Sequence, residues 1–371
     1  MKTLHKALVF VSGYIDMHYR HGGGPQFDMK RLNIACTPVV DFSVNINPLG
    51  RPNIIDQKWQ GLIDAVSPYP TINGSGITRY YNEHLGISAE NILPGNGSTE
   101  LIYLIPRVLG LKNTAIITPS YHDYERASFI SGAKTSRYPL KPETGFAPPD
   151  EHELSRICTA TDSLWLGRPN NPTATLVSRD IIYRLSEMFP EKWFIIDEAF
   201  IQFADNWKSE TMMLGPYRPN ILVLNSITKF YALAGLRLGA VIGHHRTISE
   251  LAKAKEPWTI NGIADLCAPL LIESNDYEKK TRTIIKDERI RVFNAINEIS
   301  GIKAFLPTAN FILCHWEKTD NLDDLLACLL LNNLYIRDCR NFPGLENNFF
   351  RIGLRMPQDN DLLINALRSF P

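Results

Sequence analysis

Continuous apolar runs separated by helical patterns organise the chain from about residue 96 onwards. The runs TAIITP, SLWLG, KWFIID and NILVLNS predict strands, and the stretches TELIYLIPRVLG and SRDIIYRLSEMF predict helices. A strand that is apolar along its whole length, rather than at every second position, is buried on both faces of its sheet. The pattern therefore predicts an α/β domain in which helices cover both faces of the sheet.

The pattern changes from about residue 265. A long charged stretch, DYEKKTRTIIKDERIRVFNAINEI, predicts a helix, and NFILCHW, LYIRDC and FFRIGLR predict strands with helices between them. This arrangement is typical of a smaller α+β domain, which we expect the N-terminal segment to complete. The predicted division is an N-terminal segment at residues 21–50, a large domain at 51–262 and a small domain at 263–371.

Composition excludes several classes of partner. Lys and Arg together number 39, and so do Asp and Glu, so there is no basic surplus for nucleic acid or an anionic membrane surface. The six cysteines show no CxxC or other metal-binding spacing, so we expect thiols in a reducing compartment and no metal site. No apolar stretch approaches the roughly 20 residues that span a bilayer, and the start of the chain is a weak secretory signal. We therefore expect a cytoplasmic protein without nucleic-acid or membrane partners.

Polar residues of chemical interest follow the predicted strands directly. Asp197 ends WFIID, and Lys229 follows ILVLNSIT together with Ser226 and Thr228. Tyr121 and Asn171 lie after two further strands. If these strands are parallel, their carboxyl ends meet at one edge of the sheet, where ligands bind in such folds. GNGST adds a turn that enters a helix, and backbone N–H groups at a helix N-terminus bind phosphate.

Each of these residues alone has an ordinary structural explanation. An Asp after a strand usually caps a turn, a Lys there is usually a solvated charge, and GNGST is usually a helix cap. Their conjunction is much more specific, because an amine, a carboxylate, a phosphate cup and an aromatic ring meet the demands of pyridoxal 5'-phosphate. That cofactor needs an amine to bond with its aldehyde and an anion to keep its ring nitrogen protonated.

The order and spacing of six motifs identify a family. GNGSTE, PSY, PNNPT, IIDEAF, SITKFYALAGLRLG and FRIGLR follow one another along the chain from about residue 21 to the end. In this respect the chain resembles the fold-type I pyridoxal-phosphate enzymes of the aspartate aminotransferase superfamily. The resemblance implies a three-layer α/β/α large domain with a mostly parallel sheet, which binds the cofactor, and a small α+β domain.

The same resemblance assigns expected roles to the candidate residues. Lys229 bonds covalently to the cofactor and later moves a proton, and Asp197 pairs with the ring nitrogen. Tyr121 stacks on the ring, and Asn171 donates to the ring 3-hydroxyl, helped less than usual because Phe200 stands where relatives have a Tyr. The residues expected to donate to the cofactor phosphate are Gly97, Ser98, Thr99, Ser226, Thr228 and Arg237. Tyr69 would reach this phosphate from a partner subunit, which implies a homodimer with shared active sites.

Five stretches narrow the resemblance: HGGG at 21, DFSVNINPLG at 41, DEAFIQF at 197, PWTINGIA at 257 and IRDCRNFPGL at 336. They are similar to the threonine-phosphate decarboxylases of cobalamin biosynthesis, close relatives of histidinol-phosphate aminotransferases. The resemblance implies decarboxylation of an O-phospho-L-amino acid for the linker of the cobalamin nucleotide loop. L-threonine O-3-phosphate and L-serine O-phosphate both remain open as the substrate, because one methyl group changes binding by only about 1–3 kcal/mol.

The substrate residues follow from this narrower resemblance. Arg351 is expected to clamp the substrate carboxylate and Arg337 to hold the substrate phosphate. His21 and Asn47 are further candidates for the substrate pocket, although each could equally well organise a turn. Arg355 lies two strand periods beyond Arg351, and we expect it to be a solvated charge.

Departures from the family pattern are few. HGGG replaces the usual HGGN, and Ala174 stands in NNPTAT where the family prefers Gly. The first departure bears on fine substrate contacts, and we expect the second to alter only a turn. Residues 1–20 precede the match and suggest no function.

Two alternatives remain open. An aminotransferase acting on histidinol phosphate or another amino acid would use the same cofactor residues, but Phe200 and DFSVNINPLG argue against it. A non-catalytic cofactor-binding regulator is a second alternative from another class. Regulators with this fold carry an N-terminal winged-helix domain, for which residues 1–20 are too few, and Lys229 is present. We therefore expect an enzyme.

Overall fold

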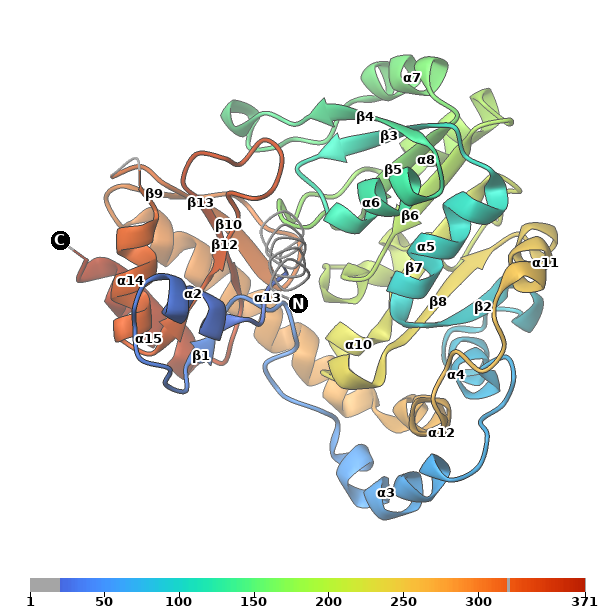
Figure 1. Ribbon diagram of the computed structural model, residues 1–371, viewed down its shortest axis with the longest axis horizontal. Helices are drawn as coiled ribbons and strands as arrows, with labels where there is room; N and C mark the ends of the chain where they lie inside the picture. Colours follow the sequence, from blue (N-terminus) through green and yellow to red (C-terminus); the bar gives the residue numbers. More distant parts are fainter. Residues whose placement is uncertain (1–20, 319–320, 371) are drawn as a thin grey trace, which may run out of the picture.

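A seven-stranded sheet forms the centre of the larger part of the molecule (Figure 1). The computed structural model describes residues 21–318 and 321–370, so the first twenty residues, with their weak secretory signal, lie outside the described residues. The strand order is β2-β8-β7-β6-β5-β3-β4, and β8 alone among these seven strands runs antiparallel to both of its neighbours. The strands are β2 (Ile92–Asn96), β3 (Asn113–Thr118), β4 (Lys134–Pro139), β5 (Ser163–Gly167), β6 (Trp193–Asp197), β7 (Ile221–Ser226) and β8 (Leu238–Gly243). The predicted mostly parallel sheet is confirmed.

Helices cover both faces of this sheet because its strands are apolar on both sides. Along β6, Ile195 packs into one hydrophobic cluster while Phe194 and Ile196 pack into the other. The first cluster also contains residues of α5 (Gly97–Leu109), α6 (His122–Ile130) and α11 (His245–Ala254). The second contains residues of α3 (Asn53–Ile63), α4 (Ser75–Leu85), α7 (Glu151–Ala160), α8 (Arg179–Met188), α9 (Trp207–Glu210), α10 (Ile227–Phe230) and α12 (Gly262–Leu270). The predicted three-layer α/β/α arrangement follows from this alternation.

The C-terminal part contains a four-stranded antiparallel sheet with the order β12-β13-β10-β9. Its strands are β9 (Ile302–Ala304), β10 (Phe311–Trp316), β12 (Arg337–Asp338) and β13 (Phe349–Gly353), and its helices are α14 (Asp323–Leu331) and α15 (Pro357–Arg368). The N-terminal segment supplies α2 (Pro25–Arg31) and β1 (Val40–Asp41), and β1 pairs in parallel with β11 (Leu334–Tyr335). Figure 1 shows this blue segment lying beside the red helices. The boundaries drawn at residues 50 and 262 stay predictions.

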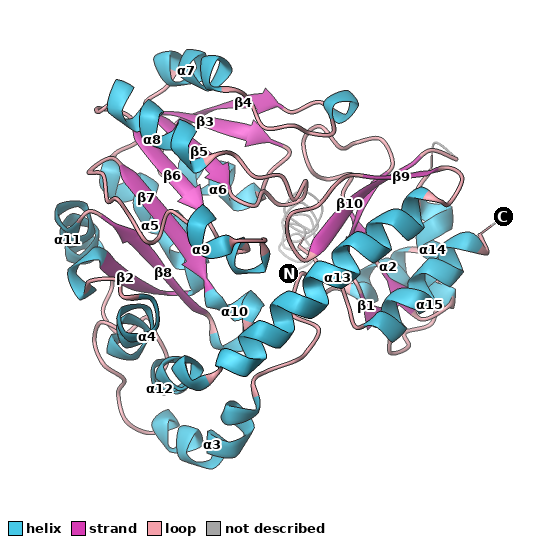
Figure 2. Ribbon diagram, turned by 180° about the vertical axis from the view of Figure 1, so that it is seen from behind, coloured by secondary structure: helices cyan, strands magenta, loops and turns pink. Residues whose placement is uncertain are grey.

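The long helix α13 (Asn275–Asn297) runs from the larger part to the C-terminal part (Figure 2). Near its start, Glu278 accepts from Tyr231 and pairs with His84 of α4. Its other end packs against β9 and β10. Because it contacts both sheets, α13 fixes how the two parts meet.

The structure also bears on the expected absences. Among the residues that it describes, no helix is both long and apolar enough to span a bilayer, and no cluster of side chains has a composition that could hold a metal ion. Each of the six cysteines is a free thiol, as their spacing predicted.

Candidate active site

The carboxyl ends of the parallel strands face the C-terminal part (Figure 1). A cavity of about 310 Å³ is lined by residues at these strand ends. The N-terminal segment and β13 supply the rest of its wall, through residues such as Val44 and Arg351. The sequence-predicted residues that line it are His21, Ser98, Thr99, Tyr121, Asn171, Asp197, Ser226, Thr228, Lys229, Arg237 and Arg351. The structure therefore brings most of the candidates together at the predicted edge of the sheet.

Lys229 lies in α10, the single turn that follows β7 directly. Its amine, Nζ, is 4.9 Å from the centre of the Phe200 ring. Burial lowers the pKa of Lys229, and Arg237 and Arg351 lower it further, while Asp197 acts in the opposite direction. A lowered amine pKa favours the neutral nucleophile over the ammonium ion. The site can therefore present an amine that is able to form a covalent bond.

Asp197 is the last residue of β6, and its carboxylate faces the same cavity. One oxygen accepts from the backbone N–H of Ala199 at 2.9 Å, and the other accepts from the hydroxyl of Tyr124 at 2.7 Å. Burial raises the pKa of Asp197, whereas Lys229 and these two donors lower it. A buried carboxylate of this kind is stabilised by a cation placed in the cavity, such as a protonated ring nitrogen.

Tyr124 is a residue that the sequence reasoning missed. It lies in the first turn of α6, three residues after Tyr121, so the two rings project from the same side of the helix start. Its ring stacks on Trp165 with a centroid distance of 5.0 Å and meets the ring of Tyr121 edge-on at 5.6 Å. The spacing Tyr-x-x-Tyr after a strand was the available signal. Tyr124 thus supports both the predicted stacking ring and the carboxylate.

The start of α5 forms an anion-binding cup. Gly97 has a φ of +69°, and a Cβ atom there would lie 2.7 Å from Nη2 of Arg237. The same Nη2 donates to the hydroxyl of Thr99 at 3.2 Å. The hydroxyls of Ser226 and Thr228 are hydrogen-bonded to each other at 2.7 Å on the adjacent wall. A glycine that admits an arginine, a helix N-terminus and two hydroxyls together provide the donors that a phosphate group needs.

Arg351 connects three parts of the chain. Its Nη2 donates to the backbone oxygen of Ser43 at 2.7 Å, and its Nη1 donates to Oδ1 of Asn171. Its Nε is buried without a hydrogen-bond partner, and burial lowers the pKa of this guanidinium to about 10. A buried donor without an acceptor costs about 1–3 kcal/mol. The Arg351 guanidinium, which has five N–H donors and uses two in these bonds, lines the cavity and suits an anionic ligand.

Asn45 is a second residue that the sequence reasoning missed. It lines the cavity, is 6% exposed, and its Oδ1 is buried without a hydrogen-bond partner. Sequence reasoning chose Asn47 in the same stretch, DFSVNINPLG. In an extended segment, residues 45 and 47 point to the same side, so the pattern did not distinguish them. Asn45 and Arg351 thus both line the cavity, and each has a buried polar atom without a hydrogen-bond partner.

The structure places Asn47 away from the cavity wall, which differs from its expected role in the substrate pocket. Its Nδ2 donates to the backbone oxygen of Phe230 at 2.7 Å and to the hydroxyl of Thr281 at 2.8 Å. Its backbone N–H donates to the backbone oxygen of Lys229 at 3.0 Å. Because these bonds occupy its donors, Asn47 fixes the turn that carries Lys229 against α13.

Arg337 lies one strand behind the cavity wall. It is paired with Arg351 across β12 and β13 and is 3% exposed. Its Nη2 donates to Oδ1 of Asn341 at 2.8 Å, and its guanidinium lies 5.3 Å from the centre of the Phe342 ring. The two arginines are therefore cross-strand neighbours, with Arg351 in the lining of the cavity and Arg337 on the strand behind it.

Two other candidates lie outside the cavity. Tyr69 is 85% exposed, and its ring lies 5.3 Å from that of Trp258. Arg355 follows the end of β13 and lies 3.9 Å from the carboxylate of Asp359, with a partly exposed side chain. Within one chain, neither residue takes part in the cavity.

His21 lies at the entrance of the cavity with a half-exposed side chain. Its ring lies 5.6 Å from that of Tyr121, and its Nε2 is 3.7 Å from the carboxylate of Asp123. These contacts place an imidazole beside the predicted stacking ring rather than in a separate Gly-rich turn.

A fully buried ion pair supports the loop that carries Asn171. Arg168 and Glu198 are both 0% exposed, and Nη1 of the arginine donates to the carboxylate at 2.9 Å. The backbone N–H of Arg168 also donates to the backbone oxygen of Asp197 at 2.7 Å. Further along this loop Ala174 has a φ of +56°, in the left-handed region, which explains the family preference for Gly there. The expected turn difference is thus a local one.

The fold and this cavity define a fold-type I enzyme, and the chain belongs to the aminotransferase class I and II family, whose profile matches residues 37–367. Enzymes of this family depend on pyridoxal 5'-phosphate. The residues of the cavity fit that cofactor. Lys229 would supply the amine, Asp197 the anion, Tyr121 the ring and the Gly97 cup the phosphate donors.

Particular relatives carry two different names. The chain is 30% identical over 354 residues to the threonine-phosphate decarboxylase of Salmonella typhimurium, covering 94% of this chain and 96% of that protein. It is also 30% identical over 338 residues to histidinol-phosphate aminotransferase 2 of Archaeoglobus fulgidus, covering 89% and 93%. The solved histidinol-phosphate aminotransferase of Clostridium acetobutylicum superimposes with a TM-score of 0.81 at 28% identity, covering 88% of this chain and 98% of that one. Sequence and structural similarity therefore identify the family, but they do not distinguish decarboxylation from transamination. That distinction has to come from the residues of the site.

Proposed function

We propose that this enzyme decarboxylates an O-phospho-L-amino acid. L-threonine O-3-phosphate would give (R)-1-amino-2-propanol phosphate, and L-serine O-phosphate would give ethanolamine phosphate, each a linker for the nucleotide loop of a cobamide. The observation that carries the proposal is the pairing of Arg337 with Arg351 on adjacent strands. Two guanidinium groups side by side suit a substrate with two anionic groups, a carboxylate and a phosphate.

Charge in the cavity supports this substrate class. Besides the cofactor lysine, Arg237 and Arg351 line the cavity, and Asp197 is the acidic residue of its lining. Since the cup at Gly97 would hold the cofactor phosphate, Arg351 in the lining and Arg337 on the adjacent strand are left for the substrate. The relative from Salmonella typhimurium, which bears the decarboxylase name, matches over 94% of this chain.

The mechanism follows from what each residue can hold. When bound, pyridoxal 5'-phosphate provides an electron sink for the pair of electrons left at the α carbon when a bond there breaks. Asp197 keeps the ring nitrogen protonated, and Tyr121 and the Gly97 cup fix the ring. Arg337 holds the substrate phosphate, so that remote binding energy orients the bond that breaks. The carboxylate leaves as carbon dioxide, and Lys229 delivers a proton to the α carbon.

Phe200 favours decarboxylation over transamination. In this structure its ring packs against the Lys229 amine and lies edge-on to Phe311, at a centroid distance of 4.9 Å. An apolar ring offers no hydroxyl to the cofactor, so Asn171 is the amide that holds the ring 3-hydroxyl. Histidinol-phosphate transamination is the competing function, because a relative with that name is equally similar.

The assembly that we propose is a homodimer with shared active sites. Tyr69 is surrounded by other exposed apolar side chains, namely Val66, Ile72, Trp258 and Leu266. A contiguous exposed apolar surface of this kind marks an interaction site. A second copy would cover this surface and receive Tyr69 at its own phosphate cup. Analytical ultracentrifugation of Tyr69→Glu should then show a shift toward monomer, and an unchanged dimer would contradict the assignment.

A cytoplasmic location accompanies this proposal. All six cysteines are free, and four of them are buried. Burial raises the pKa of the Cys158 thiol to about 11 and that of Cys267 to about 12. Such thiols are inert side chains that fit a reducing compartment.

The test is a side-by-side assay of threonine phosphate and serine phosphate with the holoenzyme, with and without 2-oxoglutarate. We expect carbon dioxide from at least one substrate at a rate that does not depend on 2-oxoglutarate. Glutamate formed without carbon dioxide would overturn the proposal and identify an aminotransferase.

A further inference from the structure

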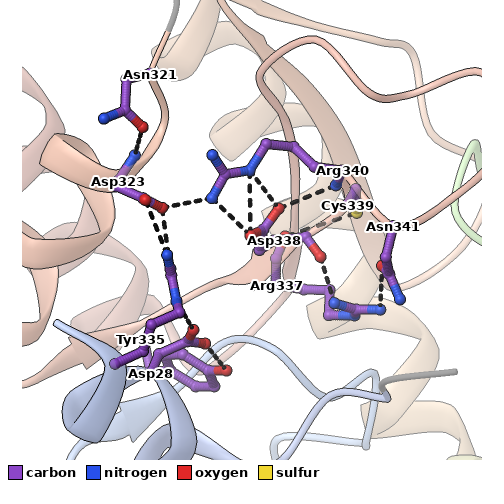
Figure 3. A network of polar contacts seen from close by, with 10 residues as sticks. Asp28, Asn321, Asp323, Tyr335, Arg337, Asp338, Cys339, Arg340 and Asn341 are labelled. Atoms are coloured by element: carbon purple, nitrogen blue, oxygen red, sulfur yellow. Dashed lines mark hydrogen bonds and ion pairs between the residues drawn. The ribbon is translucent and has the colours of Figure 1, made fainter. Parts of the chain in front are cut away.

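A network of ion pairs and hydrogen bonds surrounds the segment that carries Arg337 (Figure 3). It begins at Tyr335, whose hydroxyl donates to Oδ2 of Asp28 at 2.7 Å. Arg31 donates to Oδ1 of the same Asp28 at 3.1 Å and makes two bonds to Asp323, at 2.8 and 2.9 Å. The network therefore joins α2 of the N-terminal segment to the start of α14.

The second half of the network returns to the segment in which it began, because Tyr335 ends β11 and Asp338 ends β12, the next strand along the chain. Asp323 also accepts from Nη2 of Arg340 at 2.5 Å. Arg340 in turn contacts both oxygens of Asp338, with its Nη2 at 2.9 Å from Oδ2 and its Nε at 3.1 Å from Oδ1. Tyr335 precedes Arg337 in the sequence and Asp338 follows it. The two ends of the network therefore lie on either side of this arginine (Figure 3).

Arg337 itself is held by the same turn. Its Nη1 donates to the backbone oxygen of Asp338, and its Nη2 donates to Oδ1 of Asn341. Both acceptors belong to the turn 338–342, so the position of that turn sets the direction of the guanidinium. The outer side of the turn is fixed by Arg340, through Asp338 and Asp323. A guanidinium binds phosphate well only where its fork is aligned with two phosphate oxygens.

Burial and charge distinguish this network from an ordinary surface ion pair. Asp28 is 0% exposed, and the side chains of Asp323, Arg340 and Asp338 are 28%, 25% and 16% exposed. Among the described contacts, the carboxylates of Asp28, Asp323 and Asp338 are bridged by Arg31 and Arg340. The bond from Arg31 is the main cause that lowers the pKa of Asp323, so this carboxylate stays ionised. Networks with shared charges exceed isolated pairs in stability.

We propose that Arg31, Asp323 and Arg340 are positioning residues for phosphate selectivity. They lock the Arg337 turn to α2, and α2 is continuous with His21 and Gly22 in the cavity wall. The position of the N-terminal segment and the direction of the Arg337 guanidinium are therefore coupled. This inference rests on the proposed function, in which Arg337 binds the substrate phosphate.

The test compares two ligands that differ only in the phosphate. The holoenzyme is titrated with L-threonine O-3-phosphate and with L-threonine, and binding is followed by the absorbance of the cofactor. We expect Arg31→Gln and Asp323→Asn each to lower the affinity for the phosphorylated ligand about tenfold and the affinity for L-threonine less than about twofold. Only binding of the phosphate depends on the alignment of Arg337. Arg340→Lys, which keeps the charge, should retain part of the selectivity.

Two controls separate positioning from general destabilisation. Arg184→Gln removes an ion pair with Glu151 that joins α7 and α8, far along the chain from this turn, and should change neither ligand. The double variant Arg31→Gln with Arg340→Gln should lose less affinity for the phosphorylated ligand than the product of the losses in the two single variants Arg31→Gln and Arg340→Gln, because both arginines act through Asp323.

The outcomes are distinguishable. Suppose that the wild type binds the phosphorylated ligand more tightly than L-threonine. If the variants then bind both ligands more weakly to the same extent, or bind both as the wild type does, only the positioning role is overturned. A wild type without that preference would overturn the assignment of Arg337 to phosphate, and the positioning role with it.

Discussion

The cofactor side and the substrate side of the cavity are built differently. On the cofactor side, Lys229 and Asp197 leave the ends of two adjacent parallel strands, and the cup at Gly97 opens the helix that follows a third. On the substrate side, Arg351 and Ser43 come from distant parts of the chain and meet through a hydrogen bond, and Arg351 also donates to Asn171, the amide assigned to the cofactor ring. The sheet sets the cofactor side, with Asn47 holding the turn that carries Lys229, whereas the substrate side depends on the N-terminal segment and α13 holding the two parts together.

This difference suggests a division of roles that substitutions can test. Changes on the cofactor side should abolish the chemistry with every substrate. Changes on the substrate side should alter which molecule is bound and should leave the cofactor in place.

The largest effect is expected for Lys229→Ala. Without the amine, neither covalent attachment nor proton delivery is available, so carbon dioxide release should fall by at least about 10³-fold for every substrate. The shifted absorbance band of the attached cofactor should disappear as well. Lys253→Ala, at an exposed lysine of α11, serves as the control and should behave as wild type. Retained activity in Lys229→Ala would show that another amine does the chemistry.

A smaller and more selective effect is expected at the arginine pair. Arg351→Lys should lower kcat/KM about 10²-fold with or without a phosphate on the substrate, since the carboxylate loses its fork-shaped partner. Arg337→Lys should produce a loss of that size only for phosphorylated substrates. Arg355→Lys is the matched control and should have little effect. If Arg351→Lys and Arg337→Lys lowered kcat/KM to the same extent for substrates with and without a phosphate, the separate assignments of the two arginines to carboxylate and phosphate would be wrong.

The next effect concerns the pH profile of Tyr124→Phe. The Tyr124 hydroxyl lowers the pKa of Asp197, which burial raises. Its removal raises that pKa further, so the carboxylate is lost by protonation at a higher pH than in wild type. The acid limb of kcat/KM should therefore move toward higher pH, with about tenfold lower activity on that limb. Tyr217→Phe, whose hydroxyl bonds to Met213, should leave the limb unchanged.

The smallest effect is expected for Asn47→Ala. Its amide holds the backbone of Phe230 beside Lys229, so kcat should fall several-fold while the preference for phosphorylated substrates is kept. The lost buried hydrogen bonds should also cost about 1–3 kcal/mol of unfolding free energy, measurable by denaturant titration. A change in substrate preference without loss of kcat would return Asn47 to the substrate pocket.

The contrast between the two sides also explains what could be predicted from sequence. The apolar runs in KWFIID and NILVLNS predict two buried strands, and parallel strands bring their ends together by geometry alone, so Asp197 and Lys229 could be placed. Tyr124 escaped because its contact with Asp197 depends on how α6 packs against the sheet. The pattern of apolar and polar residues within α6 does not predict a contact between that helix and the end of β6.

The substrate side was harder because its contacts are long-range. Asn45 and Asn47 lie two residues apart in an extended stretch, and only the structure shows which of them faces the cavity. Arg31 and Asp323 are separated by 292 residues, and no spacing rule connects them. Such contacts follow from the docking of the N-terminal segment, which is a property of the whole fold.

The fate of the substrate carboxyl group distinguishes decarboxylation from transamination. The holoenzyme is mixed with L-threonine O-3-phosphate that carries ¹³C in its carboxyl group, with 2-oxoglutarate present, and the label is followed by NMR. We expect the label to appear in carbon dioxide and bicarbonate while an unlabelled amino-alcohol phosphate accumulates. Label retained in a 2-oxo acid, with glutamate formed in equal amount, would show that the enzyme is an aminotransferase instead.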